Sequence, residues 1–339
     1  MTEPAITDSL GRRLHDLRVS VTDRCNFRCV YCMPKEVFGR GYKFLAKKEL
    51  LTFEEIERLV QIFAQLGVRK IRLTGGEPLV RSELENLIER IASVDQISDI
   101  SLTTNAVLLS KQRAASLRDA GLKRVNISLD ALDDETFKAI NDVGVSVQKV
   151  LEGIDAAAGA GFDSVKVNMV VKRGMNESSI VPMAKYFHGS GNILRFIEFM
   201  DVGNTNAWHD GAVVTAREIV DMINAELPVE PMEANYHGEV ATRWKYTDGG
   251  GEIGVISSVS KPFCGDCSRA RLSAVGKLYT CLFAADGFDL MSMIRGGADN
   301  TEIDQKLRAI WGRRRDRYSE IRTVESVLLP KVEMSHIGG

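Results

Sequence analysis

Apolar residues along the chain form two patterns that alternate from the N-terminus to about residue 200. Short runs rich in Val, Ile and Leu predict six strands, at residues 14–21, 70–77, 100–105, 124–130, 165–171 and 194–200. Between these runs apolar residues recur at helical spacing, as they do at Ile56, Leu59, Val60, Phe63 and Leu66. The first part of the chain therefore predicts repeated strand–helix units.

Capping signals mark the predicted helices. Thr52 and Glu55 are spaced as a capping box before one helical pattern, and Gly67 is placed to end that helix. Ser82 and Glu85 repeat the spacing before the next helix. Successive strands start roughly 25 to 55 residues apart, which leaves room for a crossover helix each time. The sequence thus predicts an α/β fold, an incomplete (β/α)6 TIM-like barrel of parallel strands with helices outside.

The pattern changes after about residue 226. Pro228 and Pro231 precede short strand-like runs that are separated by Gly-rich turns, which predicts a smaller antiparallel β-rich cap. We therefore expect a barrel domain over residues 1–225 and a C-terminal domain over residues 226–339. The basic run at 313–317 is interpreted as a solvated helix face.

Composition and charge exclude several classes of protein. The 339 residues are 44% hydrophobic and 27% charged, as in ordinary globular proteins, and the formal net charge is −2. That charge argues against nucleic acid or an acidic membrane surface as a partner. We find no apolar run long enough to span a membrane and no signal peptide, so we expect a cytoplasmic protein.

All six cysteines lie in two tight groups. The groups have the patterns C-x3-C-x2-C and C-x2-C-x13-C and consist of Cys25, Cys29 and Cys32, and of Cys264, Cys267 and Cys281. Clustered cysteines in a cytosolic sequence are more often metal ligands than disulfides. A structural zinc site or an ordinary four-iron cluster takes four ligands. Three thiolates leave a position open for a small chelating molecule, unless His15 completes a zinc site.

Mostly polar residues gather toward the C-terminal ends of the predicted strands, at the rim where parallel α/β barrels keep their sites. They are Thr74, Gly75, Gly76 and Glu77, then Thr103, Thr104 and Asn105, then Ser128, Asp130, Lys166, Asn168, Glu198 and Met200. Any one of these groups alone would be ordinary turn chemistry, but five on one rim predict an active site.

The first cysteine group and the segment LTGGEP resemble the radical S-adenosylmethionine enzymes. In that family three thiolates hold a [4Fe-4S] cluster, the fourth iron binds S-adenosylmethionine, and reductive cleavage yields a 5′-deoxyadenosyl radical. The resemblance implies such a cluster on Cys25, Cys29 and Cys32. It places S-adenosylmethionine at Tyr31, Gly76, Ser128 and Met200.

The segment FCGDCSRARLSAVGKLYTCLF resembles the GTP 3′,8-cyclases, and the likeness extends over nearly the whole chain. It implies a second [4Fe-4S] cluster on Cys264, Cys267 and Cys281. It places the GTP substrate at Arg18, Arg72, Thr103, Lys166, Arg269, Ala270 and Arg271. Two residues apart on a strand, Arg269 and Arg271 should point to one face.

The final residues are expected to reach the active site. Val332, Met334 and Ile337 give the tail apolar residues with which to dock. The resembled family ends in the same Gly-Gly pair, which implies that Gly338 and Gly339 act in catalysis together with the two arginines.

The implied reaction removes hydrogen from C3′ of GTP and joins that carbon to C8 of the base. The product passes to a cyclic pyranopterin monophosphate synthase in molybdenum cofactor biosynthesis, and the reaction needs an electron donor. We expect a monomer or homodimer. Three alternatives stay open: a peptide-modifying radical enzyme with an auxiliary cluster, a zinc-dependent nucleic-acid-binding module, and a zinc knuckle on the second cysteine group.

Overall fold

A computed structural model describes residues 5–236, 238–327 and 329–338. Six parallel strands follow one another across the sheet in chain order, as predicted. They are β1 (Asp16–Ser20), β2 (Lys70–Thr74), β3 (Asp99–Thr104), β4 (Arg124–Ser128), β5 (Ser164–Val171) and β6 (Ile193–Glu198).

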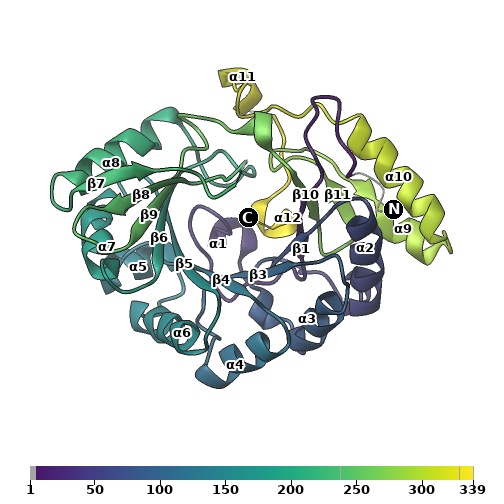
Figure 1. The fold of residues 1–339 in the computed structure, drawn as a ribbon, viewed down its shortest axis with the longest axis horizontal. Coiled ribbons are helices and arrows are strands. Elements are labelled where there is room, and N and C mark those ends of the chain that lie inside the picture. The colour runs from purple at the N-terminus through teal and green to yellow at the C-terminus, as the bar shows by residue number, and fades with distance from the viewer. Residues whose placement is uncertain (1–4, 237, 328, 339) are drawn as a thin grey trace.

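Helices cover the outer, convex face of this curved sheet (Figure 1). Those that follow strands or connect them are α2 (Phe53–Gln65), α3 (Leu84–Ala92), α4 (Lys111–Asp119), α5 (Asp134–Asn141), α6 (Val147–Gly159), α7 (Ile180–Phe187) and α8 (Ala216–Asn224). The remaining helices are α1 (Lys35–Phe38), α9 (Leu290–Arg295), α10 (Asn300–Gly312), α11 (Val324–Val327) and α12 (Met334–Ile337). Of these, α12 lies inside the curve of the sheet (Figure 1).

The C-terminal part of the chain extends both edges of the sheet. Strand β9 (Glu252–Ile256) pairs in parallel with β6, and β10 (Arg269–Leu272) pairs in parallel with β1. The antiparallel strands expected of the cap continue outward from these two, as β7 (Val229–Met232), β8 (Thr242–Tyr246), β11 (Lys277–Tyr279) and β12 (Phe288–Asp289). The twelve strands make one sheet that does not close, so the incomplete barrel is confirmed.

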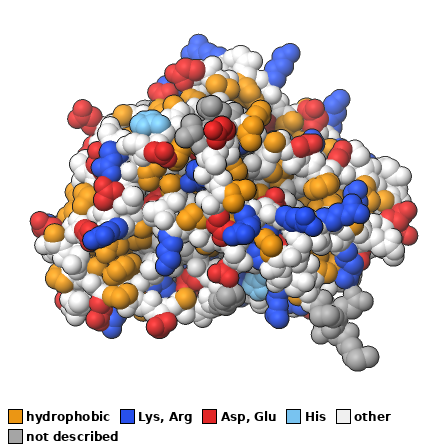
Figure 2. All heavy atoms as spheres, turned by 90° about the horizontal axis from the view of Figure 1, so that it is seen from above, with side chains coloured by type: hydrophobic (Ala, Val, Ile, Leu, Met, Phe, Trp, Pro, Cys, Tyr) orange, Lys and Arg blue, Asp and Glu red, His pale blue; other side chains and the backbone are white. Residues whose placement is uncertain are grey.

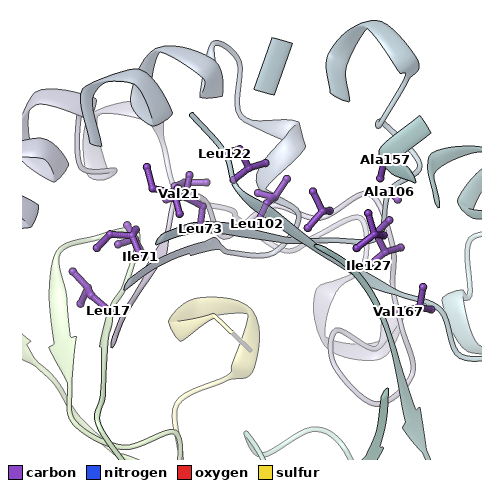
Figure 3. Packing of buried hydrophobic residues seen from close by; sticks show 14 of the residues in the cluster. Leu17, Val21, Ile71, Leu73, Leu102, Ala106, Leu122, Ile127, Ala157 and Val167 are labelled. Carbon is purple, nitrogen blue, oxygen red and sulfur yellow. The ribbon is translucent and has the colours of Figure 1, made fainter. Parts of the chain in front are cut away.

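Side-chain alternation gives the sheet an apolar outer face and a polar inner face. In β5, Val165, Val167, Met169 and Val171 are buried, whereas the residues between them are partly exposed. Figure 3 shows the buried residues of several strands packed beneath the outer helices. Each buried aliphatic side chain contributes about 1.5–3 kcal/mol. The core therefore lies outside the barrel, and the inner face remains available for polar chemistry.

One of the two predicted capping boxes is present. Thr52 Oγ1 accepts a hydrogen bond from Glu55 N at 3.2 Å, and Glu55 Oε2 accepts one from Thr52 N at 2.8 Å. The prediction for Ser82 was wrong, because the N-cap of α3 is Glu83 and its side chain makes no capping hydrogen bond. A φ of 58° at Glu83 turns the chain there and starts the helix one residue later than the capping pattern indicates.

The prediction that residues 313–317 form a solvated helix face was also wrong. Helix α10 ends at Gly312, and Arg314 is only 4% exposed. Its guanidinium lies over the Trp311 ring at 4.5 Å and donates to Asp8. Arg314 is buried because it pairs with Asp8, near the other end of the chain. The local charge pattern does not indicate this pairing.

The visible surface carries mixed charge. Figure 2 shows acidic and basic side chains interspersed over one face of the molecule, consistent with the net charge of −2. Within the described ranges, no helix combines the length and apolar character needed to cross a membrane.

Candidate active site

The first cysteine group lies on a loop directly after β1. Arg28 holds this loop, because its Nη1 donates to Cys25 O at 2.9 Å and its Nε donates to Phe38 O at 2.8 Å. Phe27 packs edge-on against Phe137, with ring centroids 6.1 Å apart. The loop is thus held by contacts with α1 and α5. Its three cysteines line the same cavity.

Gly75 and Gly76 allow this loop to pack directly against the end of β2. A Cβ on Gly75 would meet Thr22 O at 2.6 Å, and one on Gly76 would collide with Arg24 O. Their lack of a side chain therefore lets the two backbones touch immediately before Cys25. Close packing of the cysteine loop accounts for both glycines, beside the ligand approach expected from sequence.

Glu77 completes this corner of the site. Its carboxylate accepts hydrogen bonds from Thr104 Oγ1 and Asn105 N, each at 2.7 Å. Burial raises the pKa of Glu77 to about 7, although these hydrogen bonds oppose the shift. The predicted polar rim is thus partly a hydrogen-bonded scaffold. Glu198, fully buried, has the same role, since it accepts from Ala216 N and Val259 N at 2.7 Å.

The second cysteine group lies around β10 and β11, on the side of the sheet next to β1. Cys264 begins a short 3₁₀ turn, Cys267 directly follows that turn, and Cys281 comes shortly after β11. Burial works to raise the pKa of Cys267, but the cations of Arg269 and Arg314 outweigh it and lower the pKa to about 6. A thiolate is therefore favoured at Cys267, as a metal ligand requires.

Both cysteine groups face one cavity of about 300 Å³. The four predicted S-adenosylmethionine residues and most of the predicted GTP residues line the same cavity: Tyr31, Gly76, Ser128, Met200, Arg18, Arg72, Thr103, Arg269 and Arg271. Lys166 lines an adjoining cavity, which shares Arg18, Arg72 and Arg269 with the first. Ala270 is the exception, because its side chain is fully buried in the apolar core.

Three arginines stand in a row across neighbouring strands. Register pairs Arg18 with Arg271 on one side and with Arg72 on the other. Burial, followed by the charges of Arg271 and Arg72, lowers the pKa of Arg18 well below its usual value. Burial and Arg269 lower the pKa of Arg271 to about 9. Buried like charges at this spacing repel one another, so the row is suited to an anionic ligand.

Lys166 adds to this cationic wall. Burial lowers its pKa to about 7, with further contributions from Arg195 and Arg124. These two arginines were missed by sequence reasoning, although Arg195 lines both cavities and Arg124 lines the smaller one. The signal was present, because charged residues occupy inward positions of apolar strands at Arg124, Lys166 and Arg195.

The tail docks inside the sheet, as expected. Ile337 is fully buried, and Arg271 Nη1 donates to Gly338 O. Gly338 has a φ of 71°, and an added Cβ would collide with the Thr74 side chain. Gly339, the other expected tail residue, lies outside the described residues. The docked tail brings Met334 to the wall of the larger cavity.

His15 lies apart from the first cysteine group. It precedes β1 and its Nδ1 lies 3.0 Å from Asp16 Oδ2, whereas the first cysteine group follows the opposite end of that strand. The structure therefore does not bring His15 to these cysteines as a fourth ligand.

Two known sequence families match the chain in succession. Residues 19–187 match the Radical SAM superfamily, and residues 192–320 match the family described as Molybdenum Cofactor Synthesis C. Among solved structures, Streptococcus suis SuiB bound to S-adenosylmethionine superposes with a TM-score of 0.62 at 13% identity. That superposition covers 92% of this chain and 69% of SuiB, and supports the fold alone.

Full-length relatives are more similar in sequence. The chain is 49% identical to GTP 3′,8-cyclase of Acidothermus cellulolyticus, over all of both chains. It is 50% identical to GTP 3′,8-cyclase of Staphylococcus haemolyticus, over 98% of this chain and 99% of that one. With this identity over its full length, the chain belongs to the GTP 3′,8-cyclase family.

Proposed function

We propose that this protein is a radical S-adenosylmethionine enzyme that converts GTP to (8S)-3′,8-cyclo-7,8-dihydroguanosine 5′-triphosphate, the first step of molybdenum cofactor biosynthesis. One observation carries the proposal most strongly. All six cysteines, in two groups from opposite parts of the sequence, line one cavity together with a row of cations, of which Arg271 is buried and Arg18 and Arg72 are half-buried. A peptide-modifying enzyme has no evident use for that row.

The cationic wall fits a nucleoside triphosphate. Arg18, Arg72 and Arg271 lie side by side on three strands, and Lys166 and Arg195 extend the charge across the sheet. A bound triphosphate would relieve their mutual repulsion and form charge-assisted hydrogen bonds with each of them. Arg195 is therefore proposed as a phosphate ligand in addition to the residues implied by resemblance.

The first cysteine group is the proposed site of the reducible cluster. Burial raises the pKa of Cys25 to about 12, so this thiol would lose its proton to solvent only when a strongly cationic partner such as cluster iron binds the thiolate in its place. A [4Fe-4S] cluster held by Cys25, Cys29 and Cys32 would supply the electron that cleaves S-adenosylmethionine. Tyr31, Gly76, Ser128 and Met200 would hold the cofactor beside it.

The second cysteine group is the proposed site of another [4Fe-4S] cluster, whose open iron would bind the guanine of GTP. Base and triphosphate would then be held from different sides, which keeps C3′ at a fixed place in the cavity. Removing one hydrogen at C3′ and adding one at N7 makes the product an isomer of GTP. One electron and one proton must enter with the second step.

Product analysis with cysteine variants tests the proposal. Anaerobic protein, reconstituted with iron and sulfide, is incubated with S-adenosylmethionine, GTP and dithionite. Chromatography separates 5′-deoxyadenosine from the cyclised nucleotide, which has the mass of GTP. We expect Cys25→Ala to abolish both products, and Cys281→Ala to abolish only the cyclised one. Full cyclisation by Cys281→Ala would refute the role of the second group.

Further partners follow from the proposed reaction. The product would pass to a cyclic pyranopterin monophosphate synthase, and a reducing protein would supply electrons. A reducing compartment such as the cytoplasm would keep the six thiols free for cluster binding. We propose that the protein works as a monomer or homodimer.

A further inference from the structure

A buried ion network lies behind the second cysteine group and has no part in the proposed binding of GTP. It consists of Asp8, Arg12 and Arg314, which are 6%, 5% and 4% exposed. Its members come from the two ends of the described chain. Such burial of three charged groups is uncommon unless they are paired and hydrogen-bonded.

Asp8 joins the two arginines. Its Oδ2 accepts from Arg12 Nε at 2.6 Å and from Arg314 Nη1 at 3.2 Å. Its Oδ1 accepts from the backbone of Leu10 and Arg12, each at 2.9 Å. Trp311 closes the group, because its ring lies under Arg314 and its Nε1 donates to Arg12 O at 3.1 Å. Arg314 Nε also lies 3.3 Å from Asp316 Oδ2, so the two guanidiniums are paired with two carboxylates.

Other donors of the two arginines bond to the peptides that carry the second cysteine group, although Arg12 Nη1 also donates to Asp316 O at 2.7 Å. Arg12 Nη1 donates to Cys264 O at 2.8 Å, and Arg314 Nη1 donates to Cys267 O at 2.7 Å. Arg314 Nε donates to the carbonyl of Thr280, the residue before Cys281, at 3.0 Å. Each of the three cysteine segments is therefore fixed by a charge-assisted hydrogen bond from the same network.

A clasp that merely joined the ends of the chain could use any nearby carbonyl. Here three of the four carbonyl acceptors, Cys264 O, Cys267 O and Thr280 O, belong to the cysteine segments, and the fourth is Asp316 O. The hydrogen bonds leave the thiols free to face the cavity, which all three line.

We propose that Asp8, Arg12 and Arg314 are positioning residues for the second cluster, because they fix its three ligand peptides. The inference rests on the proposed function, because it requires a cluster on Cys264, Cys267 and Cys281. Partners of this kind, outside the ligands themselves, commonly tune the affinity and reduction potential of a metal site.

The test isolates the second cluster in the full-length protein by replacing Cys25, Cys29 and Cys32 with Ala. In this background we compare Arg314→Gln and Arg12→Lys. Arg315→Gln is the matched control, since Arg315 is exposed and adjacent. The measurements are iron bound after reconstitution, the rate of iron loss to a chelator, the midpoint potential, and the melting temperature of the apoprotein.

We expect both network variants to lose iron at least tenfold faster than the control, in line with the effect typical of such partners. We also expect a shifted midpoint potential, and apoprotein melting reports separately how far the broken ion pair destabilises the fold. Arg314→Gln removes both carbonyl bonds and the charge, so its effect should be the larger. If Arg314→Gln fails to fold, the rate of iron loss from Arg12→Lys, which retains the charge, tests the positioning role.

Two failures are distinguishable. A parent background that binds no cluster would refute the second cluster and, with it, the proposed function. A parent that binds a cluster, with network variants matching Arg315→Gln in iron loss and potential, would overturn the positioning role alone.

Discussion

Individual side chains show how far burial separates a binding cation from a surface charge. Resemblance indicated Arg18, Arg72 and Lys166, but only their inward positions on the strands explain why these half-buried cations gather in one place. The same alternation shows that the side chain of Ala270 points into the core, so any contact it makes with GTP would come from its backbone. Arg314 could not be found in this way, because its partner Asp8 lies 306 residues away.

Lys166 gives the site a pH dependence. Burial lowers its pKa to about 7 in the free protein, and a bound phosphate should raise it again. GTP binding then takes up a proton, so the affinity is greatest below this pKa. Above this pKa, the affinity for GTP should fall by up to about tenfold per pH unit. Anaerobic calorimetry from about pH 6 to about pH 9 measures the dissociation constant. The Lys166→Arg variant, which stays charged, should give a flatter curve, and parallel curves would exclude Lys166 as the titrating group.

Gly338 should tolerate no side chain. In Gly338→Ala the new Cβ collides with Thr74 and the φ of 71° becomes strained, which displaces the carbonyl from Arg271. We expect at least a tenfold loss of cyclised nucleotide, with 5′-deoxyadenosine formation retained. Gly189→Ala is the matched control, because Gly189 has the same φ of 71° and open space around it. If the two variants form equal amounts of cyclised nucleotide, Gly338 has no role in cyclisation.

At the scale of elements, local pattern predicted most strands and helices but not every partner. The six parallel strands and the capping box of α2 follow from periodicity within short windows. The parallel pairing of β10 with β1 joins residues about 250 positions apart, and no local signal specifies it. That pairing places Arg271 beside Arg18 and so completes the arginine row. The row could therefore not be predicted from local sequence patterns.

Strand β10 offers a test of this wall. Arg269→Ala and Arg271→Ala should each weaken GTP binding tenfold or more, because a hydrogen bond to a charged group contributes about 1.5–3 kcal/mol. Iron content should be unchanged in Arg271→Ala. On β8, Arg243→Ala is a control, since Arg243 pairs with Glu252 and lines neither cavity. Normal GTP affinity in both β10 variants would place the triphosphate elsewhere.

At the scale of the whole molecule, the proposed boundary after residue 225 divides one continuous sheet. Residues 226–339 supply the neighbours of both β1 and β6. A fragment of residues 1–225 would therefore expose two unpaired parallel edges, which favour aggregation. We expect this fragment to be insoluble alone and to be recovered when residues 226–339 are co-expressed, as judged by gel filtration. A monomeric fragment that binds S-adenosylmethionine would establish residues 1–225 as an independent folding unit.

The position of β10 also has a consequence for how the protein is made. During synthesis β1 leaves the ribosome early, but the strand that flanks it on the open side is translated some 250 residues later. At about 5–20 residues per second, β1 then waits on the order of tens of seconds for this neighbour. Contacts between such distant residues also slow folding after release. We therefore expect iron to enter the first cysteine loop only after translation has ended, when β10 has paired with β1.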